Sequence, residues 1–294
     1  MFSGAITAMI TPFREGRVDE GRLRDQIDLQ IKGGIDALVP MGTTGESPTL
    51  SIEEHQRFIE QTIKHVAGRV PVIAGVGANS TAEAMELHAF AKKVGATAGL
   101  SVNPYYNKPS QEGLYRHFMA IAEKIDLPIV LYNVPSRSAI TMQPSTVARL
   151  RRANPQRFVA IKEATGSLDL ASEIMSLCDI TVISGDDSLT LPLMSIGARG
   201  VISVLSNLLP APVKQLTKLA LAGNFSDARA IHHRLFPLTK AIFADGNPAG
   251  VKHAMKLAGI DGGEMRLPLV DANDATKSAI AEQMKKLDLP TKST

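Results

Sequence analysis

The chain contains the stretch Phe158-Val159-Ala160-Ile161-Lys162-Glu163-Ala164-Thr165-Gly166, in which four apolar residues lead into a lysine and a glycine-ended turn. Such an apolar run, with turn signals behind it, is typical of a strand buried on both faces in a parallel sheet. Lys162 then lies at the carboxyl end of the strand, where α/β folds place their chemistry. A neutral lysine in a partly apolar pocket can act as a Schiff-base nucleophile. The simpler interpretation is a lysine that reaches solvent or pairs with Glu163.

Length and composition exclude several classes of protein. The 294 residues are 44% hydrophobic and 21% charged, which is ordinary for a globular protein long enough to bury a sizeable core. A net charge of +3 without a basic, aromatic-rich stripe argues against a nucleic-acid partner. Cys178 is the single cysteine, so no disulfide framework is expected. With neither a signal-peptide pattern nor an apolar run of about 20 residues, we expect a cytoplasmic enzyme without a membrane partner.

Short apolar runs alternate with amphipathic segments along most of the chain. We expect helices at Asp19–Lys32, Ser51–Val66, Thr81–Val94 and Gln111–Lys124. Ser51-x-x-Glu54 and Ser80-x-x-Glu83 are capping-box patterns at two of these helix starts. The expected strands are Ala5–Ile10, Ala37–Met41, Val70–Val76, Ala98–Asn103, Ile129–Asn133, Phe158–Lys162, Ile180–Ser184 and Gly200–Val204.

This rhythm predicts an α/β fold. Eight β/α units in about 220 residues fit a (β/α)₈ barrel, also called a TIM barrel. A doubly wound sheet is the competitor, because alternation alone does not distinguish a closed sheet from an open one. The β pattern stops near residue 224, and only helical patterns follow. We therefore expect a catalytic barrel over residues 1–224 and a helical domain over 225–294, the latter with a structural or oligomer-forming role.

Three loops after expected strands carry side chains suited to catalysis. Gly42-Thr43-Thr44-Gly45-Glu46-Ser47 offers hydroxyls and backbone N–H groups that can hold a carboxylate or phosphate, although such a run is often an ordinary turn. Pro104-Tyr105-Tyr106-Asn107 and Tyr132-Asn133-Val134-Pro135-Ser136-Arg137 contain three of the four tyrosines. Phenols gathered on one barrel face suggest proton transfer, and Arg137 can bind a carboxylate with two hydrogen bonds.

Other kinds of site are not predicted. The seven histidines show no metal-ligand spacing with acids or with Cys178. Gly75-Val76-Gly77-Ala78-Asn79-Ser80 begins like a dinucleotide fingerprint but lacks its third glycine, and there is no phosphate-binding Gly-Lys-Ser/Thr loop. We therefore expect neither a metal nor a cofactor.

The motifs around these loops resemble the dihydrodipicolinate synthase family, within the pyruvate-dependent class I aldolases that include N-acetylneuraminate lyase. The resemblance covers the chain from the first strand into the helical tail. It rests on Gly42–Ser47, Pro104–Asn107, Tyr132–Arg137, Ile161-Lys162-Glu163-Ala164-Thr165-Gly166 and Ser184-Gly185-Asp186-Asp187.

The resemblance implies a barrel with a C-terminal helical domain, assembled as a homotetramer from two dimers. It implies condensation of pyruvate with L-aspartate 4-semialdehyde in lysine and diaminopimelate synthesis, without a cofactor. Lys162 would form an imine with pyruvate, and Thr43, Tyr132 and Tyr106 would relay protons, with Tyr106 reaching in from a neighbouring subunit. The implied substrate-binding residues are Thr44 for the pyruvate carboxylate, Arg137 for the semialdehyde carboxylate, and Gly185 and Ile202 in the pocket lining.

The resemblance also implies a feedback site for L-lysine at the dimer interface. The matching residues are Ser47, His55, Asn79, Glu83 and Tyr105. Two positions depart from the family pattern, because Pro48 replaces an alanine and Ile52 stands where well-inhibited relatives have a histidine. A capping box already explains Glu83, and His55 could be ordinary helix surface. We expect a lysine site with an altered, weaker response.

Two other functions compete with this interpretation. A sister Schiff-base aldolase acting on N-acetylneuraminate or a keto-sugar acid would share Lys162 and Tyr132. Arg137 and the Tyr105-Tyr106 pair favour the synthase, because polyhydroxylated substrates need no second carboxylate clamp. A non-catalytic binding protein on the same fold would have no need of Lys162.

Overall fold

The computed structural model describes residues 2–291, so residue 1 and residues 292–294 of the two expected domains lie outside it. Within that range, eight parallel strands form one sheet in the order β4-β1-β10-β9-β8-β7-β6-β5. A bridge between Leu38 and Val72 joins the two ends, so the sheet closes into a barrel. The strands are β1 (Gly4–Ala8), β4 (Ala37–Val39), β5 (Ile73–Gly75), β6 (Ala98–Val102), β7 (Ile129–Asn133), β8 (Phe158–Glu163), β9 (Thr181–Ser184) and β10 (Gly200–Ser203).

The apolar runs of the strands are explained by burial on both faces of the barrel wall. Successive side chains of a strand point to opposite faces, so one strand supplies two clusters. In β8, Ala160 belongs to the cluster inside the barrel, which also contains Ile183 and Ile202. Ile161 belongs to the larger cluster between the wall and the helices. This double burial confirms the prediction of a parallel sheet, and the Leu38–Val72 bridge, which joins the two end strands, confirms the closed barrel over the open alternative.

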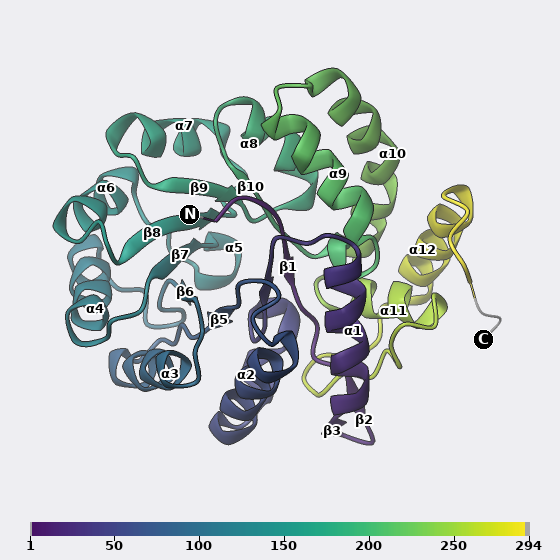
Figure 1. Cartoon of the computed structure of the whole chain (residues 1–294), viewed down its shortest axis with the longest axis horizontal. Coiled ribbons are helices and arrows are strands. Elements are labelled where there is room, and N and C mark those ends of the chain that lie inside the picture. The colour runs from purple at the N-terminus through teal and green to yellow at the C-terminus, as the bar shows by residue number, and fades with distance from the viewer. Residues whose placement is uncertain (1, 292–294) are drawn as a thin grey trace.

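Helices surround the strands, as Figure 1 shows. A complete capping box starts α2, where Ser51 Oγ accepts from the Glu54 N–H and the Glu54 carboxylate accepts from the Ser51 N–H. At α3 Ser80 Oγ accepts from the Glu83 N–H. The barrel helices are α1 (Glu20–Lys32), α2 (Ile52–Val66), α3 (Thr81–Lys93), α4 (Gln111–Lys124), α5 (Pro135–Ser138), α6 (Pro144–Ala153), α7 (Leu168–Leu177), α8 (Thr190–Ser195) and α9 (Pro210–Leu221).

The chain after residue 224 is helical and packs against the barrel. Its helices are α10 (Phe225–Phe243), α11 (Ala249–Leu257) and α12 (Asp274–Lys286), which lie together at one side of the molecule (Figure 1). Asn224 caps α10, whose residues contact α8 and α9. A division into two domains at residue 224 stays a proposal. Within residues 2–291, no helix is both long and apolar enough to cross a membrane.

The sequence predicted strand positions better than strand lengths. The expected strand Val70–Val76 is observed only as Ile73–Gly75, and the expected Ala37–Met41 ends at Val39 because Pro40 follows and Met41 has a φ of 57°. A two-stranded hairpin, β2 (Phe13–Arg14) and β3 (Arg17–Val18), was not predicted. These strands have two residues each, too few to show an alternating pattern.

Candidate active site

Lys162 lies inside the barrel because of its position in β8. It is two residues after Ala160, so it shares the inward face, while Glu163 points outward. In the sheet, Lys162 is in register with Tyr132 of β7 and with Ile183 of β9. Only 5% of Lys162 is exposed, so the prediction of a buried lysine at the carboxyl end of a strand is confirmed and the solvent-reaching alternative is wrong.

Tyr132 is the nearest aromatic neighbour of the Lys162 amine. The Nζ atom lies 4.3 Å from the centroid of the Tyr132 ring, and Tyr132 is 6% exposed. This separation is within the range of a cation–π contact between an amine and a ring face. Register and burial therefore bring together Lys162 and Tyr132, two of the four residues for which catalysis was expected.

Gly185 and Ile202 complete the surroundings of Lys162. A Cβ at Gly185 would lie 3.1 Å from both Cγ and Cε of Lys162 and 2.7 Å from Cβ of Ala164, so a larger residue would push against the lysine. Ile202 is fully buried in the interior cluster that includes Tyr132. Gly185 thus gives the Lys162 side chain its room, whereas Ile202 belongs to the apolar interior of the barrel.

A polar network lies on the outer face of the same strands. Asn133 Nδ2 donates to Glu163 Oε2 at 3.2 Å, and Asn103 Nδ2 donates to Asn133 Oδ1 at 3.1 Å. The Thr165 N–H donates to Glu163 Oε1 at 2.7 Å. Burial raises the pKa of Glu163, whereas these hydrogen bonds act in the opposite direction. These hydrogen bonds join the carboxyl ends of β6, β7 and β8 on the outer face of the barrel, and so hold the backbone from which Tyr132 and Lys162 point inward.

The loop after β4 forms one wall of the site. It contains two short 3₁₀ turns, η1 (Thr43–Gly45) and η2 (Ser47–Thr49), joined at Glu46, which has a left-handed φ of 56°. Thr44 is 3% exposed, and its Oγ1 accepts a hydrogen bond of 3.0 Å from Asn247 Nδ2. Thr43 is half-buried and faces the cavity described next.

An open cavity of about 240 Å³ lies at this end of the barrel. Its lining includes Thr43, Tyr105, Tyr132 and Arg137, so the expected loops do meet there. Arg137 is exposed, and its Nη2 donates to the backbone oxygen of Asn247 at 3.3 Å. A cavity lined by hydroxyls and a guanidinium suits a small substrate with a carboxylate.

Tyr106 is not part of this cavity within one chain. It is 91% exposed and has a φ of 72°, a left-handed conformation that tyrosine rarely adopts. The loop therefore holds a large aromatic side chain outward into solvent. Its neighbour Tyr105 is half-buried and lines the cavity instead.

A second cavity, of about 210 Å³, adjoins the first. Four of the five residues expected to bind lysine line it, namely Ser47, His55, Glu83 and Tyr105. Asn79 is outside this lining, and its backbone oxygen accepts from Asn107 Nδ2. Pro48 and Ile52, the two departures from the family pattern, also line the cavity.

Two titratable side chains of the second cavity, Tyr105 and His55, have shifted pKa values. Burial raises the pKa of the Tyr105 phenol, and the nearby Glu83 carboxylate adds to the shift. Burial lowers the pKa of His55, whose Nε2–H donates to the Gly75 oxygen at 2.7 Å. His55 is therefore a buried residue bonded to β5, and its interpretation as ordinary helix surface is wrong. Ser47, Pro48, Gly77 and Tyr105 line both cavities.

The sequence analysis assigned no chemistry to the chain after residue 224, yet Asn247, Lys252 and Arg266 contact the loop after β4 or its flanks. One feature of the sequence could have identified Lys252: this charged residue lies on the same buried part of α11 as the apolar residues Val251 and Met255. Among residues 2–291, no cluster of three or more His, Cys, Asp or Glu side chains is arranged to hold a metal ion.

Comparisons with known proteins agree with this geometry. Residues 1–287 match the model of the dihydrodipicolinate synthetase family. A 4-hydroxy-tetrahydrodipicolinate synthase from Pelobacter propionicus is 53% identical, over 98% of this chain and 100% of the relative.

Two solved structures of similar proteins contain bound ligands. The dihydrodipicolinate synthase of Acinetobacter baumannii complexed with pyruvate has a TM-score of 0.95 at 38% identity and covers 98% of this chain and 100% of its own. The enzyme of Cyanidioschyzon merolae with lysine bound has a TM-score of 0.95 at 39% identity, covering 98% and 99%. Because the family model matches residues 1–287, nearly the whole chain, the protein belongs to the dihydrodipicolinate synthetase family.

Proposed function

We propose that this protein is a 4-hydroxy-tetrahydrodipicolinate synthase, a lyase that condenses pyruvate with L-aspartate 4-semialdehyde. The observation that carries the proposal is the buried Lys162 amine, 4.3 Å from the Tyr132 ring at the carboxyl end of the barrel. Family membership supports the same activity. The reaction would be the first committed step of lysine and diaminopimelate synthesis, and a cytoplasmic location belongs to the same proposal.

The first half of the reaction is imine formation. The neutral amine of Lys162 attacks the ketone carbon of pyruvate, and the oxygen leaves as water, which needs a proton. Tyr132 and Thr43 are among the hydroxyl side chains that line the cavity, and Tyr132 lies beside the Lys162 amine, so we assign these two residues to this transfer. Thr44 and the N–H groups of its loop hold the pyruvate carboxylate.

The second half forms a carbon–carbon bond and then the ring. Loss of a methyl proton converts the imine to an enamine, whose carbon attacks the aldehyde of the semialdehyde. The new alkoxide takes a proton from the relay. The amine of the semialdehyde then attacks the imine carbon, and the Lys162 nitrogen leaves as the ring closes. Every step is a proton transfer, an addition or an elimination that these side chains can perform without a cofactor.

Arg137 is the residue that distinguishes this substrate from those of the sister aldolases. It is exposed and lines the same cavity as Thr43. A guanidinium there can bind the carboxylate of the semialdehyde while its aldehyde group reacts with the enamine. N-acetylneuraminate has no second carboxylate for it to bind.

We propose that the enzyme works as a homotetramer of two dimers, in which Tyr106 of one subunit completes the site of its neighbour. The 91% exposure of Tyr106 and its left-handed φ support this, because an aromatic side chain held in solvent suits an interface. A fully active monomer, shown by sedimentation and assay at the same concentration, would contradict the shared site.

We propose that the second cavity binds L-lysine as a feedback inhibitor. The Glu83 carboxylate can pair with a lysine amine, and the shared Ser47–Pro48 wall offers a direct route to the active site. Because Ile52 supplies no polar group, we expect weak inhibition. Full activity at millimolar lysine would exclude the site as a regulator.

The activity itself is tested by offering alternative substrates. We expect the purified protein to consume pyruvate and aspartate semialdehyde together, and the Lys162→Ala variant to consume neither. Cleavage of N-acetylneuraminate with a higher kcat/KM would favour the sister aldolase. No turnover of either substrate by the folded protein would favour a binding protein.

A further inference from the structure

A fully buried ion pair lies directly behind the loop after β4. The Lys252 ammonium, on α11, pairs with the Glu46 carboxylate, and both side chains are 0% exposed. Lys252 Nζ also donates to the Glu264 backbone oxygen at 2.7 Å and lies 4.6 Å from the centroid of the Phe13 ring. Burial lowers the pKa of Lys252, whereas the Glu46 charge opposes that shift. The catalytic scheme uses neither residue.

Stability alone does not account for this pair. Removing two charges from water costs about as much as their attraction returns, so a buried ion pair is often no better than an apolar pair of the same size. Breaking it is costly, because one charge is then left without a partner. In some proteins a buried ion pair selects one conformation of the chain over others.

Glu46 fixes the conformation of the loop that carries Thr43 and Thr44. Its backbone N–H donates to the Thr43 oxygen at 3.1 Å and closes the η1 turn. Its φ of 56° is unfavourable for a residue with a side chain, so the turn needs support from elsewhere. The buried carboxylate, held from behind by Lys252, supplies that support.

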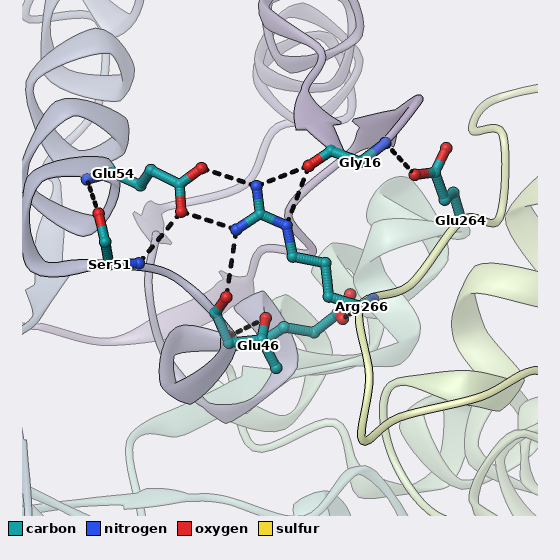
Figure 2. A network of polar contacts seen from close by, with 7 residues as sticks. Gly16, Glu46, Ser51, Glu54, Glu264 and Arg266 are labelled. Atoms are coloured by element: carbon teal, nitrogen blue, oxygen red, sulfur yellow. Dashed lines mark hydrogen bonds and ion pairs between the residues drawn. The ribbon is translucent and has the colours of Figure 1, made fainter.

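Arg266 holds the other side of the same loop. Its backbone N–H donates to Glu46 Oε2 at 3.2 Å. Its guanidinium lies between Glu54 and the backbone of Gly16, as Figure 2 shows, and also donates to the Thr49 oxygen at 3.1 Å. In total the guanidinium makes five hydrogen bonds, which tie the η2 turn and the start of α2 to the segment after α11.

We propose that Lys252 and Arg266 are positioning residues, which hold the 43–49 segment so that Thr43 and Thr44 face pyruvate. The chain after residue 224 then takes part in the active site through contacts more than 200 residues apart in sequence. The inference rests on the proposed function, because pyruvate is the ligand that the loop receives.

The test measures pyruvate binding without the second substrate. Each variant is given a short borohydride pulse at increasing pyruvate, and the adduct on Lys162 is quantified by mass. The variants are Glu46→Gln, Lys252→Met, the charge-neutral double variant and Arg266→Lys. Arg151→Met is the matched control, because Arg151 is also buried and holds the opposite end of β8 through a 3.0 Å bond to the Phe158 oxygen.

We expect the half-maximal pyruvate concentration to rise tenfold or more in the Glu46 and Lys252 variants and less in Arg266→Lys, since a small displacement of a binding group has effects of up to about 100-fold. The double variant should unfold at a higher temperature than Lys252→Met yet keep the binding defect. Arg151→Met should lose stability with an unchanged half-maximal concentration.

Four results would contradict either the positioning role or the proposed function. Wild-type pyruvate binding in the folded double variant would overturn the positioning role. Wild-type binding in both single variants, Arg266→Lys and Glu46→Gln, would overturn it as well. The same conclusion follows if Arg151→Met weakens pyruvate binding as much as the loop variants do. A wild-type protein without any adduct would instead overturn the proposed function.

Discussion

Two buried histidines predict a loss of stability in mild acid. His88 of α3 is fully buried, and His117 of α4 is 6% exposed. Burial lowers the pKa of each from 6.5 to about 4, and the His117 charge lowers that of His88 further. His88 Nδ1–H donates to the Ala84 oxygen at 2.6 Å, and His117 Nδ1 bonds to the Thr81 hydroxyl at 2.9 Å. The fold therefore holds both rings neutral.

The sign and size of the effect follow from the two pKa values. Each native pKa is below the unfolded value, so the contribution is complete above about pH 6.5 and is lost as the pH falls toward 4. A pKa difference of about 2.5 corresponds to about 3 kcal/mol for each histidine. Across that window, the free energy of unfolding should fall by about 2.7 kcal/mol per pH unit for the pair.

The assay is urea unfolding at a fixed protein concentration from pH 8 to pH 4.5. His88→Asn with His117→Asn should be less stable than wild type at pH 8, because volume is lost, but should show a shallower pH dependence. His233→Asn, at an exposed position of α10, serves as the control and should keep the wild-type slope. An unchanged slope in the double variant would refute the assignment of the acid sensitivity to these two side chains.

Three further predictions concern the active site. Tyr132→Phe should still form the pyruvate adduct but lose about 10²- to 10⁴-fold in kcat, and a wild-type kcat in steady-state assays would remove Tyr132 from the relay. Gly185→Ala should slow adduct formation, because the added Cβ meets the Lys162 side chain. Gly262→Ala is the control and should not slow it, because no atom lies closer than 3.7 Å to the added Cβ. Equal rates in the two variants would contradict crowding at Gly185. Arg137→Leu should raise the KM for the semialdehyde at least tenfold with little change for pyruvate, and a larger effect on pyruvate would reverse the two assignments.

The fold could be predicted because its signals are local. Eight apolar runs at a regular spacing indicate strands buried on both faces, and Lys162 at the end of one run breaks the pattern in a way that marks a functional site. Gly185 could be placed near Lys162 only by resemblance. Its proximity depends on the register of β8 and β9, which no local pattern records.

The role of the helical tail could not be predicted for a related reason. Lys252 and Glu46 are separated by 206 positions, and each residue alone is an ordinary charged side chain. Arg266 lies in an irregular segment that has no periodicity to interpret. Burial of a charge is visible only when the partner is known, so pairing across the fold was outside the reach of sequence patterns.

Lys162 is assigned as the nucleophile, and reduction with borohydride in the presence of pyruvate, followed by peptide mapping, tests this assignment. We expect a mass increase equal to one reduced pyruvate imine, confined to the peptide that contains Lys162 and absent from Lys162→Ala. An adduct on another lysine, or none on the folded wild-type protein, would contradict it.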